Sequence, residues 1–219
     1  MTKDEVKHIL ASVGKEIGAN VSVLFGVAGI ESNFNPSSRS KSGTYMGIYQ
    51  LSNGWGGCIG DDRLDLLKSI KCFWNNHSTY KQRWLSSGTT SWDDFYHYGI
   101  HQQGFAGFSE IYKNRNSLLI DLSSARQKSI LSNKPSSASW DRVSDWWDYF
   151  YKKFYVNYNL AGPFIEGNRS LQILDNVLGT VGLNRSYSVW DNSEKVLIYG
   201  GSIVLLCGLY CFIKNRLID

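Results

Sequence analysis

Residues 21–52 read VSVLFGVAGIESNFNPSSRSKSGTYMGIYQLS. The first ten are almost all apolar and predict a helix over residues 21–33, with a loop at residues 35–45. Glu31 lies at the end of that helix, where burial disfavours the ionised carboxylate and raises its pKa. A general acid needs this arrangement, because it must hold its proton near neutral pH. Position alone favours a simpler interpretation, a helix-end glutamate exposed at the start of the loop.

The residues around Glu31 favour the acid. Over about 22 residues they resemble the signature of the lytic transglycosylases of the soluble-lytic, goose-lysozyme-like group. That signature comprises Glu31-Ser32-x-Phe34-Asn35-Pro36, then Ser40, Gly43 and Gly47-Ile48-Tyr49-Gln50-Leu51. Two departures concern details of a sugar subsite: the two glycines are one residue further apart than usual, and Tyr49 replaces the usual Met.

A second stretch supports the same family. It resembles the Tyr-x-x-His-Gln-Gln-Gly version of phage virion-associated members and reads Phe95-Tyr96-x-Tyr98-x-x-His101-Gln102-Gln103-Gly104-x-x-Gly107. His101-Gln102 replaces the Tyr-Asn of the better known form. A weaker similarity runs from Ala125-Arg126 to Asn133, so that the resemblance covers roughly residues 3–135.

The resemblance implies a mainly α, lysozyme-like (goose-type) helical domain that acts on peptidoglycan. In that family one glutamate protonates the glycosidic oxygen between N-acetylmuramic acid and N-acetylglucosamine. It then serves as base for the muramic C6 hydroxyl, which gives a 1,6-anhydro product. Glycosidases ordinarily use two carboxylates, and here no Asp or Glu follows Glu31 until Asp61. The sequence therefore agrees with a single catalytic carboxylate.

Carried over by motif position, Glu31 is the acid and base, and Ser40 and Gln50 bind or orient sugar. Ile48 and Tyr49 are expected to line the cleft, and Gln103 belongs to the same substrate-binding set. Either Tyr96 or Tyr98 is expected to form a hydrogen bond near Glu31, and the sequence does not choose between them. For Ser40 and Gln50 the alternative is loop capping, and His101 is expected to be a packing residue.

Three functional alternatives stay open. The closest is a hydrolytic lysozyme in which Asp61 or Asp62 positions a water molecule. A virion membrane or structural protein that kept the fold without catalysis is the second. A holin-like membrane protein is the third, and it leaves the Glu31 motif unexplained.

Periodicity predicts further helices along the first 158 residues, and strand signals are weak throughout. The expected helices cover residues 3–18, 62–83, 92–100, 105–114, 117–132 and 140–157. In the last of these, Val143, Trp147, Phe150 and Phe154 form a stripe expected to be core, while Trp146 and Tyr149 lie off it, and the sequence does not decide whether they face outward. We assign residues 1–158 to the catalytic domain and 159–194 to a connector with one short amphipathic helix.

Residues 195–219 are expected to be a transmembrane anchor with a short basic tail. Residues 196–213, VLIYGGSIVLLCGLYCFI, hold no charge and just suffice to span a hydrocarbon core of about 30 Å. Lys214 and Arg216 follow, which predicts a cytoplasmic tail; the alternative is a buried core helix. Because no signal peptide is visible, we expect a protein anchored by this single C-terminal span, in a virion's internal membrane or the host cell envelope, with lipid and other virion proteins as partners.

Net charge and the spacing of histidines and cysteines bear on nucleic-acid binding, metal sites and disulfides. A net charge of +4 is too weak to predict nucleic-acid binding. The four histidines and four cysteines show no metal-ligand spacing, so we expect neither a metal nor another cofactor. Cys58 and Cys72 can bridge only in an oxidising compartment, and the sequence leaves that open.

Overall fold

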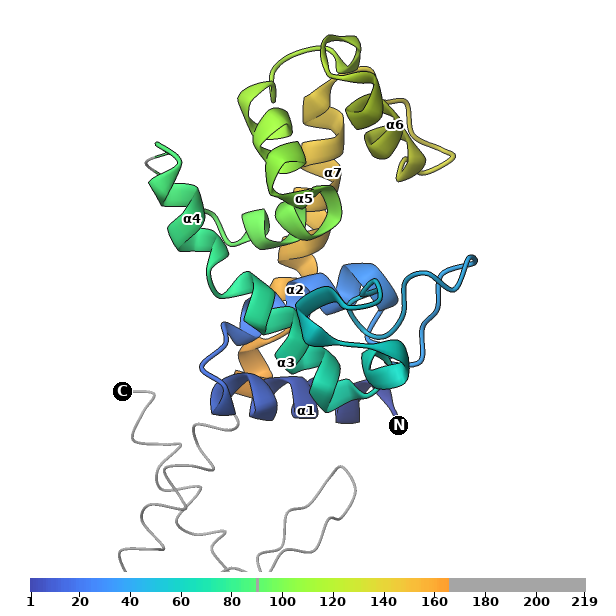
Figure 1. Cartoon of the computed structure of the whole chain (residues 1–219), viewed down its shortest axis with the longest axis vertical. Helices are drawn as coiled ribbons and strands as arrows, with labels where there is room; N and C mark the ends of the chain where they lie inside the picture. The colour runs from blue at the N-terminus through green and yellow to red at the C-terminus, as the bar shows by residue number, and fades with distance from the viewer. Residues whose placement is uncertain (90, 166–219) are drawn as a thin grey trace, which may run out of the picture. The chain divides into compact units, whose positions relative to one another are not determined.

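The computed structural model describes residues 1–89 and 91–165, and these are mainly α-helical, as predicted (Figure 1). No β-strand occurs among them, only isolated bridges. The α-helices are α1 (Lys3–Glu16), α2 (Val21–Ser32), α3 (Leu66–His77), α4 (Tyr80–Ser86), α5 (Phe95–Lys113), α6 (Ser124–Ser132) and α7 (Val143–Asn159). Three short 3-10 helices are η1 (Trp55–Gly57), η2 (Gly60–Arg63) and η3 (Leu119–Asp121).

Helix α2 is buried along most of its length, which explains its lack of a polar face. Its start is capped by Asn20, whose side chain accepts a hydrogen bond from Val23 N–H at 3.2 Å. Helices α1, α5 and α7 all pack against it. It ends at Asn33, which adopts a left-handed conformation with φ of 53°.

Helix α7 joins two groups of elements. In Figure 1 it passes from α5 and α6 to α2, beside which α1 and α3 lie. Two glycines of α2 admit side chains of α7: a Cβ atom on Gly26 would overlap the Phe154 ring, and one on Gly29 would overlap Asn157. The packing of α2 against α7 therefore fixes the helix that carries Glu31.

Several predicted helix boundaries are wrong. The predicted helix 62–83 is two helices, because α3 ends at His77 and α4 begins at Tyr80. The predicted helices 92–100 and 105–114 correspond to the two segments of α5, which are separated at Gly104, where φ of 70° and ψ of 162° suit only glycine; the first segment begins later than predicted, at Phe95, and runs past residue 100. Residues 117–123 are not part of α6, since their backbone bonds to the segment before α7, for example Leu119 N–H to the Asp141 carbonyl at 2.9 Å.

The aromatic stripe of α7 is core, as predicted. The sequence left the directions of Trp146 and Tyr149 open, and the structure decides them: Trp146 is fully buried, and Tyr149 is half-buried. Because the partner helix α5 and its aromatic side chains cover more than one stripe of α7, residues off the predicted stripe are also enclosed. The packed region continues past residue 158, since Ala161 is buried and the Phe164 ring lies 5.4 Å from that of Phe25.

Cys58 and Cys72 form a disulfide with a Cα–Cα distance of 5.8 Å. It ties the segment after η1 to α3. The predicted connector beyond residue 165 and the predicted span at residues 196–213 lie outside the described residues. Within residues 1–89 and 91–165, none of the helices combines the length and apolar character needed to cross a membrane.

Candidate active site

Glu31 occupies the last turn of α2, enclosed by protein and still partly accessible to solvent. Its carboxyl group forms no hydrogen bond or ion pair with another described residue. Burial raises its pKa from 4.5 to about 8. The negative end of the helix dipole acts in the same direction. Glu31 therefore holds its proton at neutral pH while remaining within reach of a ligand.

The backbone next to Glu31 is strained. Asn33, Phe34 and Gln50 have φ values of 53°, 62° and 49°, the only positive φ angles among non-glycine residues in the described part of the chain. Such conformations are unfavourable for a bulky residue like Phe34. They persist where surrounding contacts enforce them, and they concentrate at functional sites.

Residues 46–51, here called the site turn, lie against the end of α2. Met46 and Leu51 exchange backbone hydrogen bonds of 3.1 and 2.8 Å across the turn. The Gln50 side-chain amide donates to the carbonyl oxygens of Gly47 at 2.9 Å and Ser38 at 3.3 Å. Gln50 thus stabilises the turn through its amide nitrogen. This is the loop-capping role that the sequence offered as the alternative to sugar binding.

Two side chains hold the site turn from opposite sides. The Ser32 hydroxyl, beside Glu31, donates to the Ile48 carbonyl at 2.9 Å. From α5, His101 Nε2 donates to the Tyr49 carbonyl at 2.9 Å; a carbonyl only accepts, so the proton is on Nε2. The site turn is therefore fixed between α2 and α5.

Arg63 is a supporting residue that sequence reasoning missed. It is only 5% exposed, and its guanidinium donates to the carbonyl oxygens of Gly60 (2.9 Å), Thr44 (2.8 Å) and Leu51 (3.1 Å). It thereby ties the site turn to η2. Its partners are backbone atoms, which leave no mark in the sequence, so no motif signals its role.

The structure distinguishes the two candidate tyrosines. Burial, and after it the charge of Glu31, raises the pKa of Tyr98 well above its usual value, whereas Glu31 is not among the groups that shift the pKa of Tyr96. Tyr96 packs instead against Trp84 and Phe108, at ring distances of 5.2 and 5.3 Å. Tyr98 is therefore the tyrosine that the structure associates with Glu31.

Ile48 and Tyr49 do not line a cleft in this structure, contrary to expectation. Both have no exposed surface. The Tyr49 ring stacks on Phe73 at 4.1 Å. The turn reverses the chain so tightly that their side chains enter the core and support the site from beneath.

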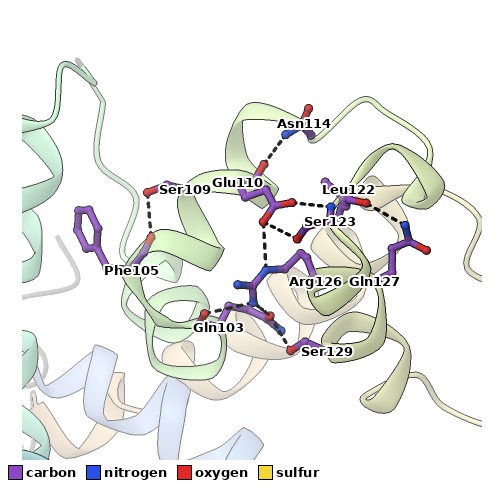
Figure 2. Close-up of polar contacts among 10 residues, drawn as sticks. All are labelled: Gln103, Phe105, Ser109, Glu110, Asn114, Leu122, Ser123, Arg126, Gln127 and Ser129. Atoms are coloured by element: carbon purple, nitrogen blue, oxygen red, sulfur yellow. Dashed lines mark hydrogen bonds and ion pairs between the residues drawn. The ribbon is translucent and has the colours of Figure 1, made fainter.

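Ser40 and Gln103 also have structural tasks. The Ser40 hydroxyl accepts the Tyr45 N–H at 3.1 Å and so closes the loop before the site turn. Gln103 was expected to bind substrate, but it is 7% exposed and faces Arg126 and Ser129 of α6 (Figure 2). The kink at Gly104 turns α5 towards α6, which places Gln103 in their contact.

Three histidines lie side by side beneath the site turn, and the rings of His97 and His101 are each 5.5 Å from that of His77. Burial lowers the pKa of His97 and His101 to about 4. His101 is half-buried and stays neutral, in keeping with the packing role expected of it. Within residues 1–89 and 91–165 no group of three His, Cys, Asp or Glu side chains is arranged to hold a metal ion.

Comparison with known protein families found no family model that matches this chain, and comparison with curated proteins found no significant match.

Proposed function

We propose that this protein is a lytic transglycosylase that cleaves the β-1,4 bond between N-acetylmuramic acid and N-acetylglucosamine in peptidoglycan. The observation that carries the proposal is Glu31, a partly accessible carboxyl group whose pKa burial raises to about 8. It occurs in a motif that resembles this enzyme family. A lysozyme-like, goose-type fold is part of the same proposal.

The proposed reaction uses Glu31 twice. Its carboxyl proton passes to the glycosidic oxygen as the bond from that oxygen to muramic C1 breaks. The resulting carboxylate then accepts the proton of the muramic C6 hydroxyl, whose oxygen bonds to C1. Glu31 ends protonated again, and a 1,6-anhydro sugar forms without water.

The surroundings of Glu31 favour this route over hydrolysis with a second carboxylate. No neighbouring acid contributes to the shift in the pKa of Glu31. Asp61 and Asp62, which a hydrolytic lysozyme would use, lie in surface ion pairs with Arg39 at 3.4 Å and Lys68 at 2.6 Å. Both carboxylates are thus occupied by cations of the protein itself.

The test is digestion of purified peptidoglycan sacculi by the full chain, with the released muropeptides identified by mass spectrometry. We expect products that end in 1,6-anhydromuramic acid, and we expect Glu31→Gln to abolish release while the helical circular dichroism is unchanged. Glu16→Gln is the matched control, because Glu16 is an exposed glutamate at the end of α1.

Three results would contradict the proposal. Products with a reducing muramic acid end would make the enzyme a hydrolytic lysozyme. Release by Glu31→Gln at the wild-type rate would place the acid elsewhere, and absence of any release by the wild type would favour the non-catalytic alternative.

We also propose that residues 196–213 anchor the protein in a membrane, in a virion or the host cell envelope, where other virion proteins are its neighbours. The support is the uncharged apolar stretch followed by Lys214 and Arg216. Co-sedimentation with phosphatidylglycerol vesicles at high salt tests this. The full chain should remain bound, and a chain with Leu205→Lys and Leu206→Lys should be released.

A further inference from the structure

The hydroxyl group of Tyr98 already has one hydrogen-bond partner on its own helix. The side-chain amide of Gln102, one turn further along α5, donates from Nε2 to the Tyr98 hydroxyl oxygen at 2.9 Å. Tyr98 is 1% exposed, so water does not freely compete for this hydroxyl. Since its oxygen accepts from Gln102, its own proton is left for another acceptor.

The orientation of the Gln102 amide is fixed by its other end. Gln102 Oε1 lies 3.1 Å from Trp146 Nε1 and 3.0 Å from Gln103 Nε2. An indole N–H can only donate, so the atom of Gln102 that faces Trp146 must be oxygen. The amide nitrogen of Gln102 therefore faces Tyr98.

The orientation of Gln103 is fixed in the same way at the corner between α5 and α6 (Figure 2). Its Oε1 accepts from Arg126 Nη1 at 2.5 Å and from the Ser129 hydroxyl at 2.9 Å. A guanidinium group has donors only, so Gln103 presents oxygen to Arg126 and nitrogen to Gln102.

Arg126 is itself held in place. Its side chain is 17% exposed and lies 3.7 Å from the Glu110 carboxylate. Gly107 leaves the room that the guanidinium occupies, since a Cβ atom there would overlap it. The hydrogen bonds from Arg126 through Gln103 and Gln102 to Tyr98, here called the amide chain, therefore run in one direction only.

We propose that Gln102 and Gln103 are positioning residues, whose fixed amide orientation makes the Tyr98 hydroxyl a hydrogen-bond donor towards Glu31. This inference rests on the proposed function of Glu31. The charge of Glu31 contributes to the raised pKa of Tyr98, which agrees with the two groups facing each other. When Glu31 has given its proton to the leaving sugar, its carboxylate has an acceptor free, and the Tyr98 hydroxyl, whose oxygen already accepts from Gln102, has a hydrogen to donate.

A double-mutant cycle on peptidoglycan release by the full chain tests the proposal, with Gln102→Met, Tyr98→Phe and the two combined. We expect Gln102→Met to lower the rate about 10- to 100-fold, and Tyr98→Phe to lower it at least as far. In the Tyr98→Phe background, Gln102→Met should have no further effect, because the hydroxyl that it positions is gone. Equal fold losses in both backgrounds would show a merely structural role and overturn the proposal.

Gln127→Met is the matched control. Gln127 lies in the same corner and donates to the carbonyl oxygens of Leu122 at 2.8 Å and Ile120 at 3.2 Å, outside the amide chain (Figure 2). It should lower thermal stability without lowering the rate. Trp146→Phe is a second route if Gln102→Met fails to fold: it removes the indole donor, and its loss of rate should also vanish in the Tyr98→Phe background.

Nuclear magnetic resonance separates failure of this proposal from failure of the proposed function. The side-chain NH₂ signals of Gln102, identified by their loss in Gln102→Met, should shift in Tyr98→Phe and stay in place in Gln127→Met. Signals that do not move in Tyr98→Phe would overturn the amide chain whatever the activity. Shifted signals together with full activity of Glu31→Gln would keep the chain and refute the role of Glu31, and with it the positioning role.

Discussion

The end of α2 and the corner between α5 and α6 each hold a half-buried glutamate, and they treat it in opposite ways. Glu31 has no hydrogen-bond or ion-pair partner among the described residues, and burial raises its pKa. Glu110 accepts from Ser123 N–H at 2.8 Å and from its hydroxyl at 3.2 Å, faces Arg126, and has a lowered pKa. The same side chain is thus a proton donor in one place and a fixed anion in the other. The hydrogen-bond and ion-pair partners of each glutamate, more than its residue type, decide whether it is a proton donor or an anion.

The two regions also differ in backbone. The α2 end and site turn hold all three positive-φ non-glycine residues of the described chain, while at the corner the one departure from helical backbone within α5 falls on a glycine, Gly104. A fold gains nothing from an unpartnered carboxyl group beside strained backbone. Their coincidence at Glu31 is therefore what distinguishes a candidate site from a structural junction.

The largest effect should come from Gly47→Ala in the site turn. Gly47 has φ of 80°, and a Cβ atom there would meet the backbone carbonyl of Arg63, which cannot move aside. We expect the free energy of unfolding to fall by about 4 kcal/mol or more. At the corner, a Cβ atom at Gly107 would meet the end of the Arg126 side chain, which can shift where a backbone carbonyl cannot, so Gly107→Ala should cost less, about 1–2 kcal/mol.

Gly43→Ala distinguishes the effect of a steric clash at the Cβ atom from the effect of a positive φ angle alone. Gly43 also has a positive φ of 71°, but nothing lies within 4 Å of the position that its Cβ atom would take. It should cost about 1 kcal/mol in urea unfolding. Equal losses for Gly43→Ala and Gly47→Ala would show that the carbonyl of Arg63 is not the cause.

The next largest effect is the pH dependence of Glu31→Gln stability. The folded-state pKa of Glu31 lies above its unfolded value, so its protonated form stabilises the fold fully below about pH 4.5, and that contribution is lost as pH rises through about 8. Wild type and Glu31→Gln should unfold alike near pH 4.5, and the variant should be more stable at pH 9. The gain in the free energy of unfolding of the variant over wild type is at most about 5 kcal/mol, at about 1.4 kcal/mol per pKa unit. If urea unfolding shows that Glu31→Gln is no more stable than wild type at pH 9, the Glu31 carboxylate is solvated in the folded protein.

Removal of the disulfide should act on the site region and spare the corner. Cys58→Ser with Cys72→Ser frees a cross-link of sequence separation 14, which is worth about 3 kcal/mol by loop entropy. Hydrogen exchange should rise around η1 and α3 and stay unchanged in α6. A uniform rise along the chain would show that the two regions do not open separately.

The smallest effect should come from Glu110→Gln. Its folded-state pKa is lowered, so its contribution is present above about pH 4.5 and lost as pH falls through the lowered value. Solvent screening of this surface pair keeps the loss at pH 7 to about 0.5 kcal/mol. The difference from wild type should disappear once the pH lies below that lowered value, opposite in pH direction to that of Glu31→Gln. A loss that persists there would assign the effect to packing.

Local patterns sufficed to predict much of this molecule from sequence. Apolar periodicity predicted the helical class and the core stripe of α7, because each reflects neighbours along one helix. The position of Glu31 at the end of an apolar helix left an exposed glutamate as the simpler interpretation, and only the motif around it favoured a carboxyl group with a raised pKa.

Contacts between distant segments were decided only by the tertiary structure. The choice of Tyr98 over Tyr96, the burial of Trp146, the inward direction of Gln103 and the bracing by Arg63 all depend on which elements meet. Arg63 bonds to backbone carbonyl groups, which every residue carries, and Gln103 meets an arginine 23 residues away. The sequence pointed to Glu31 as the residue that holds the proton, because its motif is local. The tertiary structure decided which side chains fix the backbone around Glu31, because those contacts join distant segments.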